Sequence, residues 1–137
     1  GQPTVAVHAV ALEEVVHYGI FSGVWENKQE TILKLTAISE KPSCENARDY
    51  LAVSSRRQAE NYYAAFGAYV ITKDVYDRLG YAVEREIVNE NGEVELTDAL
   101  DYVRKEKGMM AYIPDGCSYD IGNAAAYRKT VTEFGKQ

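Results

Sequence analysis

Hydrophobic residues fall into short runs separated by polar stretches, and the length of each run predicts a strand or a helix. Residues 4–10 form a nearly unbroken apolar run, as in a strand that is covered on both faces. Residues 20–26 and 31–39 are two further strand-like runs, and the polar segment 27–30 between them predicts a hairpin turn. A later run at 64–72 returns to the strand pattern. A sheet is therefore expected.

Two segments in the middle of the chain have helical character. Residues 43–64 are rich in Ala, Arg, Glu, Asn and Tyr, contain no Gly or Pro, and begin with Ser43 as a capping residue, so they are predicted to be mainly helical. The next helix is expected to begin at Thr72, with Asp74 in its first turn, and to end at Gly80.

The later helices are predicted from the spacing of their apolar residues. One helix ends at Gly108, where a left-handed cap is expected, and has four apolar residues on one face: Leu96, Ala99, Leu100 and Val103. A short strand at 109–113 follows it. The last helix begins after Asn123 and is predicted to turn four apolar residues toward the core: Ala124, Tyr127, Val131 and Phe134. Because strands and helices mix without strict alternation, we predict an α/β fold in which helices flank a mixed sheet.

Composition sets the size and the partners of this domain. The 137 residues, 46% of them hydrophobic and 26% charged, fit one globular domain over 1–137. The net charge of -6 repels phosphate backbones and anionic lipid, so neither a nucleic-acid nor a membrane partner is expected. No apolar stretch approaches the roughly 20 residues of a membrane span, and Cys44 and Cys117 are too few for a disulfide framework. We therefore expect a cytoplasmic location.

The first candidate for chemistry is the tripeptide Glu40-Lys41-Pro42, which follows the second hairpin strand. Proline stops that strand, so both charged side chains are expected at the end of the sheet, where ligands of α/β proteins bind. A carboxylate accepts hydrogen bonds from sugar hydroxyls, and an ammonium beside it can hold a phosphate. A solvated ion pair at the strand end is the alternative interpretation.

Three other residues are candidates, each with a structural alternative. Gly67 interrupts a good strand, which indicates a bulge, a close backbone approach to a ligand or a simple packing need. Glu93 lies just before a helix, where a negative charge is favourable in any case. Asp120 lies between a strand and a helix, and there it is either a turn residue or a ligand of Mg2+, which takes one or two carboxylates together with substrate phosphates.

Five segments in order resemble the C-terminal half of the sugar-phosphate nucleotidyltransferase family, in particular its bacterial-type UTP:glucose-1-phosphate uridylyltransferases. The resemblance spans nearly the whole chain and implies the C-terminal part of a Rossmann-like nucleotidyltransferase fold. The matching segments are Tyr18-Gly19-Ile20, Glu40-Lys41-Pro42, Phe66-Gly67-Ala68-Tyr69-Val70-Ile71-Thr72, Gly92-Glu93-Val94-Glu95-Leu96-Thr97-Asp98-Ala99 and Tyr119-Asp120-Ile121-Gly122-Asn123.

The resemblance implies a role for each candidate residue. Glu40 would bind hydroxyls of glucose, Lys41 would hold the phosphate of glucose 1-phosphate, and Gly67 would let its backbone approach the sugar. Glu93 would lie near the sugar pocket, and Asp120 would be one of two aspartates that hold Mg2+. Lys41 and Asp120 are thus the expected catalytic residues of uridylyl transfer from UTP, which gives UDP-glucose and pyrophosphate.

The phosphate-binding part of that family is absent from this sequence. There is no Gly-rich loop of either common nucleotide-binding type. UTP is therefore expected to bind only together with the missing N-terminal half, and the chain alone is expected to be inactive. Half a sheet is expected to expose an apolar edge or face and so to self-associate. A non-catalytic sugar-phosphate-binding or assembly module of the same fold is the alternative.

Overall fold

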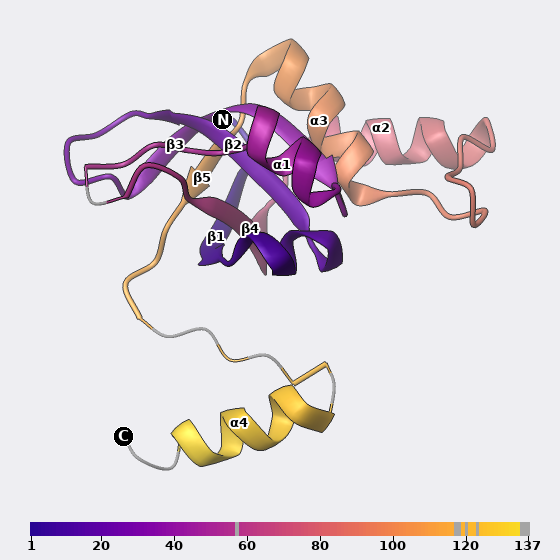
Figure 1. Ribbon diagram of the computed structural model, residues 1–137. Coiled ribbons are helices and arrows are strands. Elements are labelled where there is room, and N and C mark those ends of the chain that lie inside the picture. Colours follow the sequence, from indigo (N-terminus) through magenta and orange to yellow (C-terminus); the bar gives the residue numbers. More distant parts are fainter. Residues whose placement is uncertain (57, 117–118, 120, 123, 135–137) are drawn as a thin grey trace.

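The computed structural model describes residues 1–56, 58–116, 119, 121–122 and 124–134, and in these residues strands and helices alternate irregularly (Figure 1). The elements, in chain order, are β1 Thr4–Val10, η1 Leu12–His17, β2 Gly19–Trp25, β3 Ile32–Glu40, α1 Cys44–Tyr50, β4 Tyr62–Val70, α2 Lys73–Glu84, α3 Leu96–Lys107, β5 Met110–Tyr112 and α4 Ala124–Phe134. The 3-10 helix η1 was not predicted. The predicted α/β class is confirmed.

The five described strands form one mixed sheet that closes on itself in the order β1, β4, β2, β3, β5 and back to β1. Strands β1 and β5 run parallel, whereas every other pair is antiparallel. Closure gives each described strand two neighbours, so its backbone groups are paired on both sides along part of its length. No described strand therefore lies at a sheet edge along its whole length, although β4 pairs with β2 only at Tyr63 and Ala64.

Two hydrophobic clusters lie on the two faces of this sheet. The interior cluster combines strand residues such as Phe21 and Leu33 with Leu100 and Val103 of α3. The outer cluster is built where η1 and α1 cover the sheet, and its members are Val15, Ile20, Ala47, Leu51, Tyr62 and Ala64. Both faces of β2 and β4 are thus partly covered, which explains why their sequences contain consecutive apolar residues.

The predicted helix over 43–64 is mostly wrong. Ser43 does cap a helix, since its hydroxyl accepts a hydrogen bond of 3.1 Å from the backbone N–H of Asn46, but α1 already ends at Tyr50. The chain then turns back, and Val53 pairs with Asn61 in an antiparallel bridge. The Asn61 side chain also donates to the carbonyl of Val53, at 3.1 Å, so these bonds compete successfully with helical ones.

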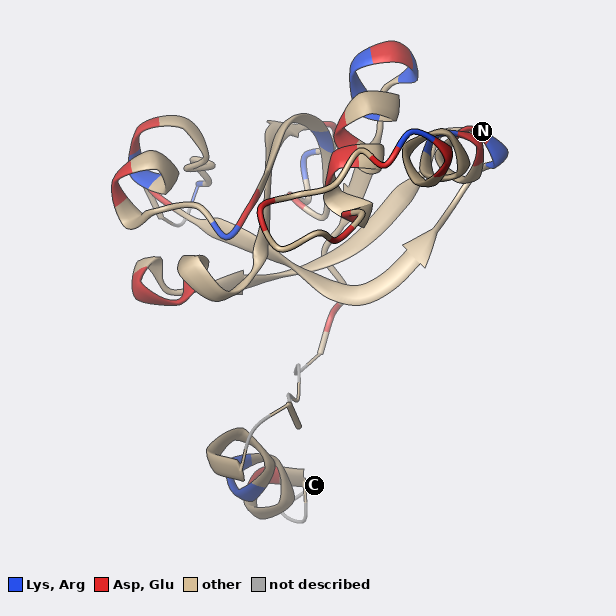
Figure 2. Ribbon diagram, turned by 90° about the vertical axis from the view of Figure 1, so that its right-hand side faces the viewer, with Lys and Arg blue, Asp and Glu red and all other residues tan. Residues whose placement is uncertain are grey.

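Two other helix predictions need correction. Helix α2 does not stop at Gly80 but continues to Glu84. Ala82, beyond the glycine, is buried, and such packing outweighs the weak helix propensity of one glycine. Helix α4 forms as predicted, yet its apolar residues do not face a core. Tyr127 and Val131 are each 55% exposed and Phe134 is 64% exposed. Figures 1 and 2 show α4 lying apart from the closed sheet, so no described element covers its apolar face.

None of the helices in the described ranges combines the length and the apolar character that crossing a membrane requires.

Candidate functional site

Glu40 is the last residue of β3, where it pairs with Gly19 at the start of β2. Its half-buried side chain points to α3, since carboxylate oxygen Oε2 accepts a hydrogen bond of 2.7 Å from the hydroxyl of Thr97. This contact joins two residues 57 positions apart in the sequence. The predicted position at the end of the sheet is thus confirmed, and a strand-end carboxylate is held beside the first turn of a helix.

Lys41 continues directly from this strand end with an unusual backbone. Its φ of 42° lies in the left-handed region, which non-glycine residues seldom adopt. Its N–H donates to the carbonyl of Tyr18 at 3.0 Å and so extends the β2–β3 pairing, while Pro42 is buried and the Lys41 side chain is exposed. Such conformations cost roughly 1–3 kcal/mol and cluster at functional sites. Nothing in the sequence pattern predicts this conformation.

Gly67 forms a bulge, which was one of the predicted explanations for it. Between the pairs Val5–Tyr69 and Val7–Ala65, the single residue Ala6 of β1 faces residues 66–68 of β4. Gly67 has a φ of 80°, and a side chain added to it would meet no atom within 4 Å. The bulge therefore leaves open space beside an exposed backbone. An approach of that backbone to a ligand stays a prediction.

Glu93 lies exposed in the loop that leads into α3. Asn89 shapes this loop: its side-chain oxygen accepts from the N–H of Glu93 at 3.0 Å, and its side-chain amide donates to the carboxylate of Glu95 at 2.6 Å. Four residues after Glu93, Thr97 contacts Glu40. The loop that carries Glu93 thus leads into the helix turn that touches the strand-end carboxylate.

Tyr69, on the bulged strand β4, is affected by the charge of Glu40. Burial, and then the negative charge of Glu40, raise the pKa of the Tyr69 phenol above its usual value. Tyr69 follows Gly67 by two residues on β4. The Glu40 carboxylate therefore contacts the start of α3 and acts electrostatically on a residue of β4. Sequence reasoning did not identify Tyr69 or Thr97 as neighbours of Glu40, because no local pattern encodes contacts between distant segments.

Asp120, the predicted magnesium ligand and one of the two expected catalytic residues, lies outside the residues that the structure describes. Within the described part of the chain, no group of three or more His, Cys, Asp or Glu side chains is placed to hold a metal ion.

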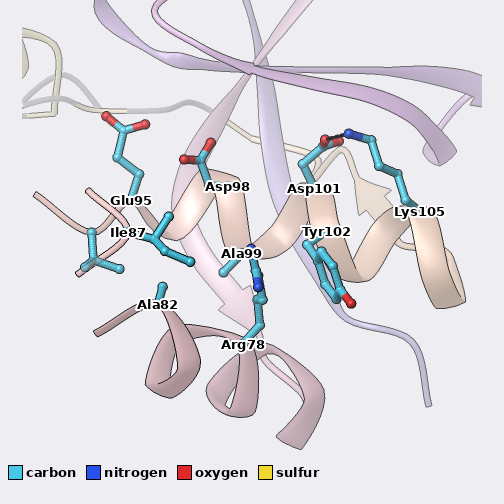
Figure 3. Close-up of a pocket in the computed structure, with 10 residues that line it drawn as sticks. Arg78, Ala82, Ile87, Glu95, Asp98, Ala99, Asp101, Tyr102 and Lys105 are labelled. Carbon is cyan, nitrogen blue, oxygen red and sulfur yellow. Dashed lines mark ion pairs between the residues drawn. The ribbon is translucent and has the colours of Figure 1, made fainter. Parts of the chain in front are cut away.

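A separate hollow of about 280 Å3 lies between α2 and α3 (Figure 3). In Figure 3 the carboxylates of Glu95 and Asp98 point to one side of it, and Asp101 forms an ion pair with Lys105. The guanidinium of Arg78 stands 4.3 Å from the centre of the Tyr102 ring and 5.1 Å from that of Tyr81. The cation–π contact with Tyr102 links α2 to α3, whereas Tyr81 lies on α2 itself. Neither Glu40 nor Lys41 lines this hollow.

A family sequence model and individual relatives were compared with the chain, and the two comparisons agree. The sequence model of the Nucleotidyl transferase family matches residues 1–137. The chain is 28% identical over 134 residues to UTP–glucose-1-phosphate uridylyltransferase 1 of Staphylococcus saprophyticus, and 29% identical over 123 residues to the UTP–glucose-1-phosphate uridylyltransferase of Pseudomonas aeruginosa. These alignments cover 98% and 90% of this chain, but 40% and 38% of the relatives. The chain thus spans about two fifths of the length of these curated relatives.

Solved structures agree on the fold. The crystal structure of UDP-glucose pyrophosphorylase complexed with UDP-glucose matches with a TM-score of 0.77 and 30% sequence identity, over 98% of this chain and 44% of that chain. The apo form of UDP-glucose pyrophosphorylase matches with a TM-score of 0.76 and 28% identity, over 98% and 43% of the two chains. The predicted nucleotidyltransferase fold is therefore confirmed.

Proposed function

The chain belongs to the nucleotidyl transferase family, and we propose that it supplies the sugar-phosphate side of uridylyl transfer from UTP to glucose 1-phosphate, which gives UDP-glucose and pyrophosphate. The observation that carries this proposal is the strand end of β3. There a carboxylate is held in place by Thr97, and the next residue presents an exposed lysine from a left-handed backbone. The names of the relatives supply the substrates in this proposal.

The roles of the site residues follow from their chemistry. Glu40 accepts hydrogen bonds from hydroxyls of glucose, because an ionised carboxylate is an acceptor on both oxygens. Lys41 neutralises the phosphate of glucose 1-phosphate as a point charge. The exposed backbone of Gly67 approaches the sugar through the open space beside the bulge, and Glu93 lies near the sugar pocket.

Mg2+ bound by Asp120 and the substrate phosphates is part of the same proposal. When bound, such an ion would neutralise charge on the transferring phosphoryl group. The catalytic role assigned to Asp120 depends on that ion.

Complete catalysis is assigned to a longer protein, because this chain spans about two fifths of its curated relatives. UTP would then bind only together with the missing N-terminal half. We expect no pyrophosphate release when the 137-residue chain is mixed with UTP, glucose 1-phosphate and Mg2+. Turnover by the purified chain would overturn this part of the proposal.

Self-association is a further part of the proposal, and it is supported by α4 rather than by a sheet edge. Tyr127, Val131 and Phe134 expose apolar surface on a helix that no described element covers. Light scattering at high concentration is expected to show species larger than a monomer, and a purely monomeric chain would contradict this. The cytoplasmic location and the lack of nucleic-acid and membrane partners stay predictions from composition.

The Lys41→Ala variant tests the sugar-phosphate site. Calorimetric titration should show glucose 1-phosphate binding at least about tenfold more weakly to this variant, because a hydrogen bond to a charged group contributes roughly 1.5–3 kcal/mol. Binding of unphosphorylated glucose should not change. Lys34→Ala is the matched control, since Lys34 is an exposed lysine on β3, the strand that Lys41 directly follows. Equal affinities of the wild type and Lys41→Ala for glucose 1-phosphate would refute the assignment.

An assay of pyrophosphate release separates the enzyme from its alternative, a non-catalytic sugar-phosphate-binding or assembly module. Both hypotheses predict that the isolated chain binds glucose 1-phosphate. Only the enzyme predicts that adding the N-terminal half of a related transferase, such as the one from Staphylococcus saprophyticus, restores pyrophosphate release that Lys41→Ala then abolishes.

A further inference from the structure

Thr97 uses its hydroxyl for a contact outside its own helix. It is the second residue of α3, so the residues three and four positions earlier, whose carbonyls a Thr within a helix commonly bonds, precede the helix. Here the hydroxyl instead donates across to Oε2 of Glu40 at 2.7 Å. Both side chains are half-buried, so bulk water competes only partly for this bond. The contact links the orientation of the Glu40 side chain to the position of α3.

Gly19 provides the space in which this carboxylate lies. Glu40 pairs with Gly19 across the β2–β3 hairpin. A Cβ atom added to Gly19 would lie 2.8 Å from Oε2 of Glu40, 3.6 Å from Oγ1 of Thr97 and 3.7 Å from the ring of Phe21. The first distance is shorter than real Cβ contacts allow. The Glu40 carboxylate therefore occupies a slot between the Gly19 backbone and the Thr97 hydroxyl.

This slot fixes one carboxylate oxygen and leaves the other for a ligand. Among the described residues, the bond from Thr97 is the one hydrogen bond that the Glu40 carboxylate accepts. Oε1 is then available to accept from a hydroxyl. A side chain held in its binding conformation before the ligand arrives loses less conformational entropy on binding, and so binds more tightly.

We propose that Thr97 is a positioning residue. Its hydroxyl holds Glu40, in the space that Gly19 leaves open, in the conformation that receives a sugar hydroxyl. The inference rests on the proposed function for the identity of the ligand. The orientation of Glu40 itself does not depend on that ligand, so it has an independent measurement.

The binding test compares Thr97→Val with Thr97→Ser. Valine keeps the shape of threonine and removes the hydroxyl, whereas serine keeps the hydroxyl. Calorimetry with glucose 1-phosphate should show about three- to tenfold weaker binding to Thr97→Val, the range expected for one net hydrogen bond, and near-wild-type binding to Thr97→Ser. Equal binding by the wild type and Thr97→Val would overturn the proposal.

The second measurement needs no ligand and uses Tyr69 as a reporter of the Glu40 charge. The Glu40 carboxylate contributes to the raised pKa of the Tyr69 phenol, so Glu40→Gln should lower that pKa. If Thr97 holds the carboxylate in place, Thr97→Val should also change the pKa of Tyr69 and Thr97→Ser should not. NMR titration of ring-labelled tyrosine resolves this, with Tyr69→Phe to assign the signal among the eleven tyrosines.

The two measurements keep the two hypotheses apart. If the wild type binds no glucose 1-phosphate, the proposed function fails, and the Tyr69 titration alone decides whether Thr97 positions Glu40. If Thr97→Val titrates like the wild type while Glu40→Gln does not, the positioning role is wrong even where glucose 1-phosphate binds as proposed.

Discussion

Replacing Phe21 with alanine is expected to lower the free energy of unfolding by about 3–5 kcal/mol, the range for truncating a buried aromatic side chain. Phe21 is 1% exposed and is the largest fully buried side chain among the described residues. It lies in the interior cluster, where strand residues meet α3. Because the closed sheet is held by strands on all sides, its interior has little freedom to collapse around the cavity, which favours the upper part of this range.

Urea unfolding followed by circular dichroism measures this effect. Val24→Ala is the control, because Val24 lies on the same strand but is 57% exposed, and it should change the free energy of unfolding by no more than about 0.5 kcal/mol. A loss below about 1 kcal/mol for Phe21→Ala would contradict the packed interior. Phe21 also lies next to the Gly19 slot, so its removal should weaken glucose 1-phosphate binding as well.

The strands were predicted well because their signals are local. The apolar run at 4–10 coincides with β1, and the hairpin formed by β2 and β3 lies within about one residue of its predicted bounds. The closure of the sheet was not predictable from such signals. It depends on β5, whose three residues pair with both β1 and β3, and no periodic pattern in a single segment specifies partners so distant in sequence.

The helices show where tertiary contacts override local preference. Composition favoured a helix over 43–64, but the bridge from Val53 to Asn61 places that chain beside the sheet instead. Spacing correctly predicted that the apolar residues of α4 share one side of a helix. Their burial depends on what packs there, and Tyr127, Val131 and Phe134 stay more than half exposed although the ring of Tyr119 contacts that of Phe134. Local propensity thus predicted the helices and strands better than it predicted what packs against them.

Part of the candidate site was predictable, because local signals specify the end of a strand. Pro42 ends the strand, and that local signal placed Glu40 and Lys41 at the end of the sheet. The partner of Glu40 was not predictable, because Thr97 lies 57 residues away and no local pattern distinguishes it from a threonine that is merely exposed on a helix surface. The slot made by Gly19 is likewise visible only once β2 and β3 are paired.

Gly23→Ala and Gly80→Ala are expected to change stability in opposite directions. A Cβ atom on Gly23 would lie against the carbonyl oxygen of Lys34, so backbone has to move, which should cost roughly 1–3 kcal/mol or more. A Cβ atom on Gly80 meets nothing within 4 Å on helix α2, so alanine there should stabilise the protein by about 0.5–1 kcal/mol. Urea unfolding of both variants against the wild type measures the difference, and a Gly23→Ala variant as stable as the wild type would contradict the packing at the hairpin.

The hairpin at Gly23 also sets the position of the candidate site. Ser22 pairs with Ala37 and Gly23 with Leu35, so Thr36 is an extra residue in β3. Without that bulge, the register of the pairs near the turn would continue along the hairpin and place Ser39 opposite Gly19. A slip of one residue exchanges the two faces of a strand, so Glu40 would move away from Thr97. If alanine at position 23 relieves its clash by removing the bulge, glucose 1-phosphate binding should fall together with stability. Gly80→Ala should raise stability and leave binding unchanged. A Gly23→Ala variant that loses stability and keeps full affinity would contradict a coupled loss of the bulge and of the Glu40 position.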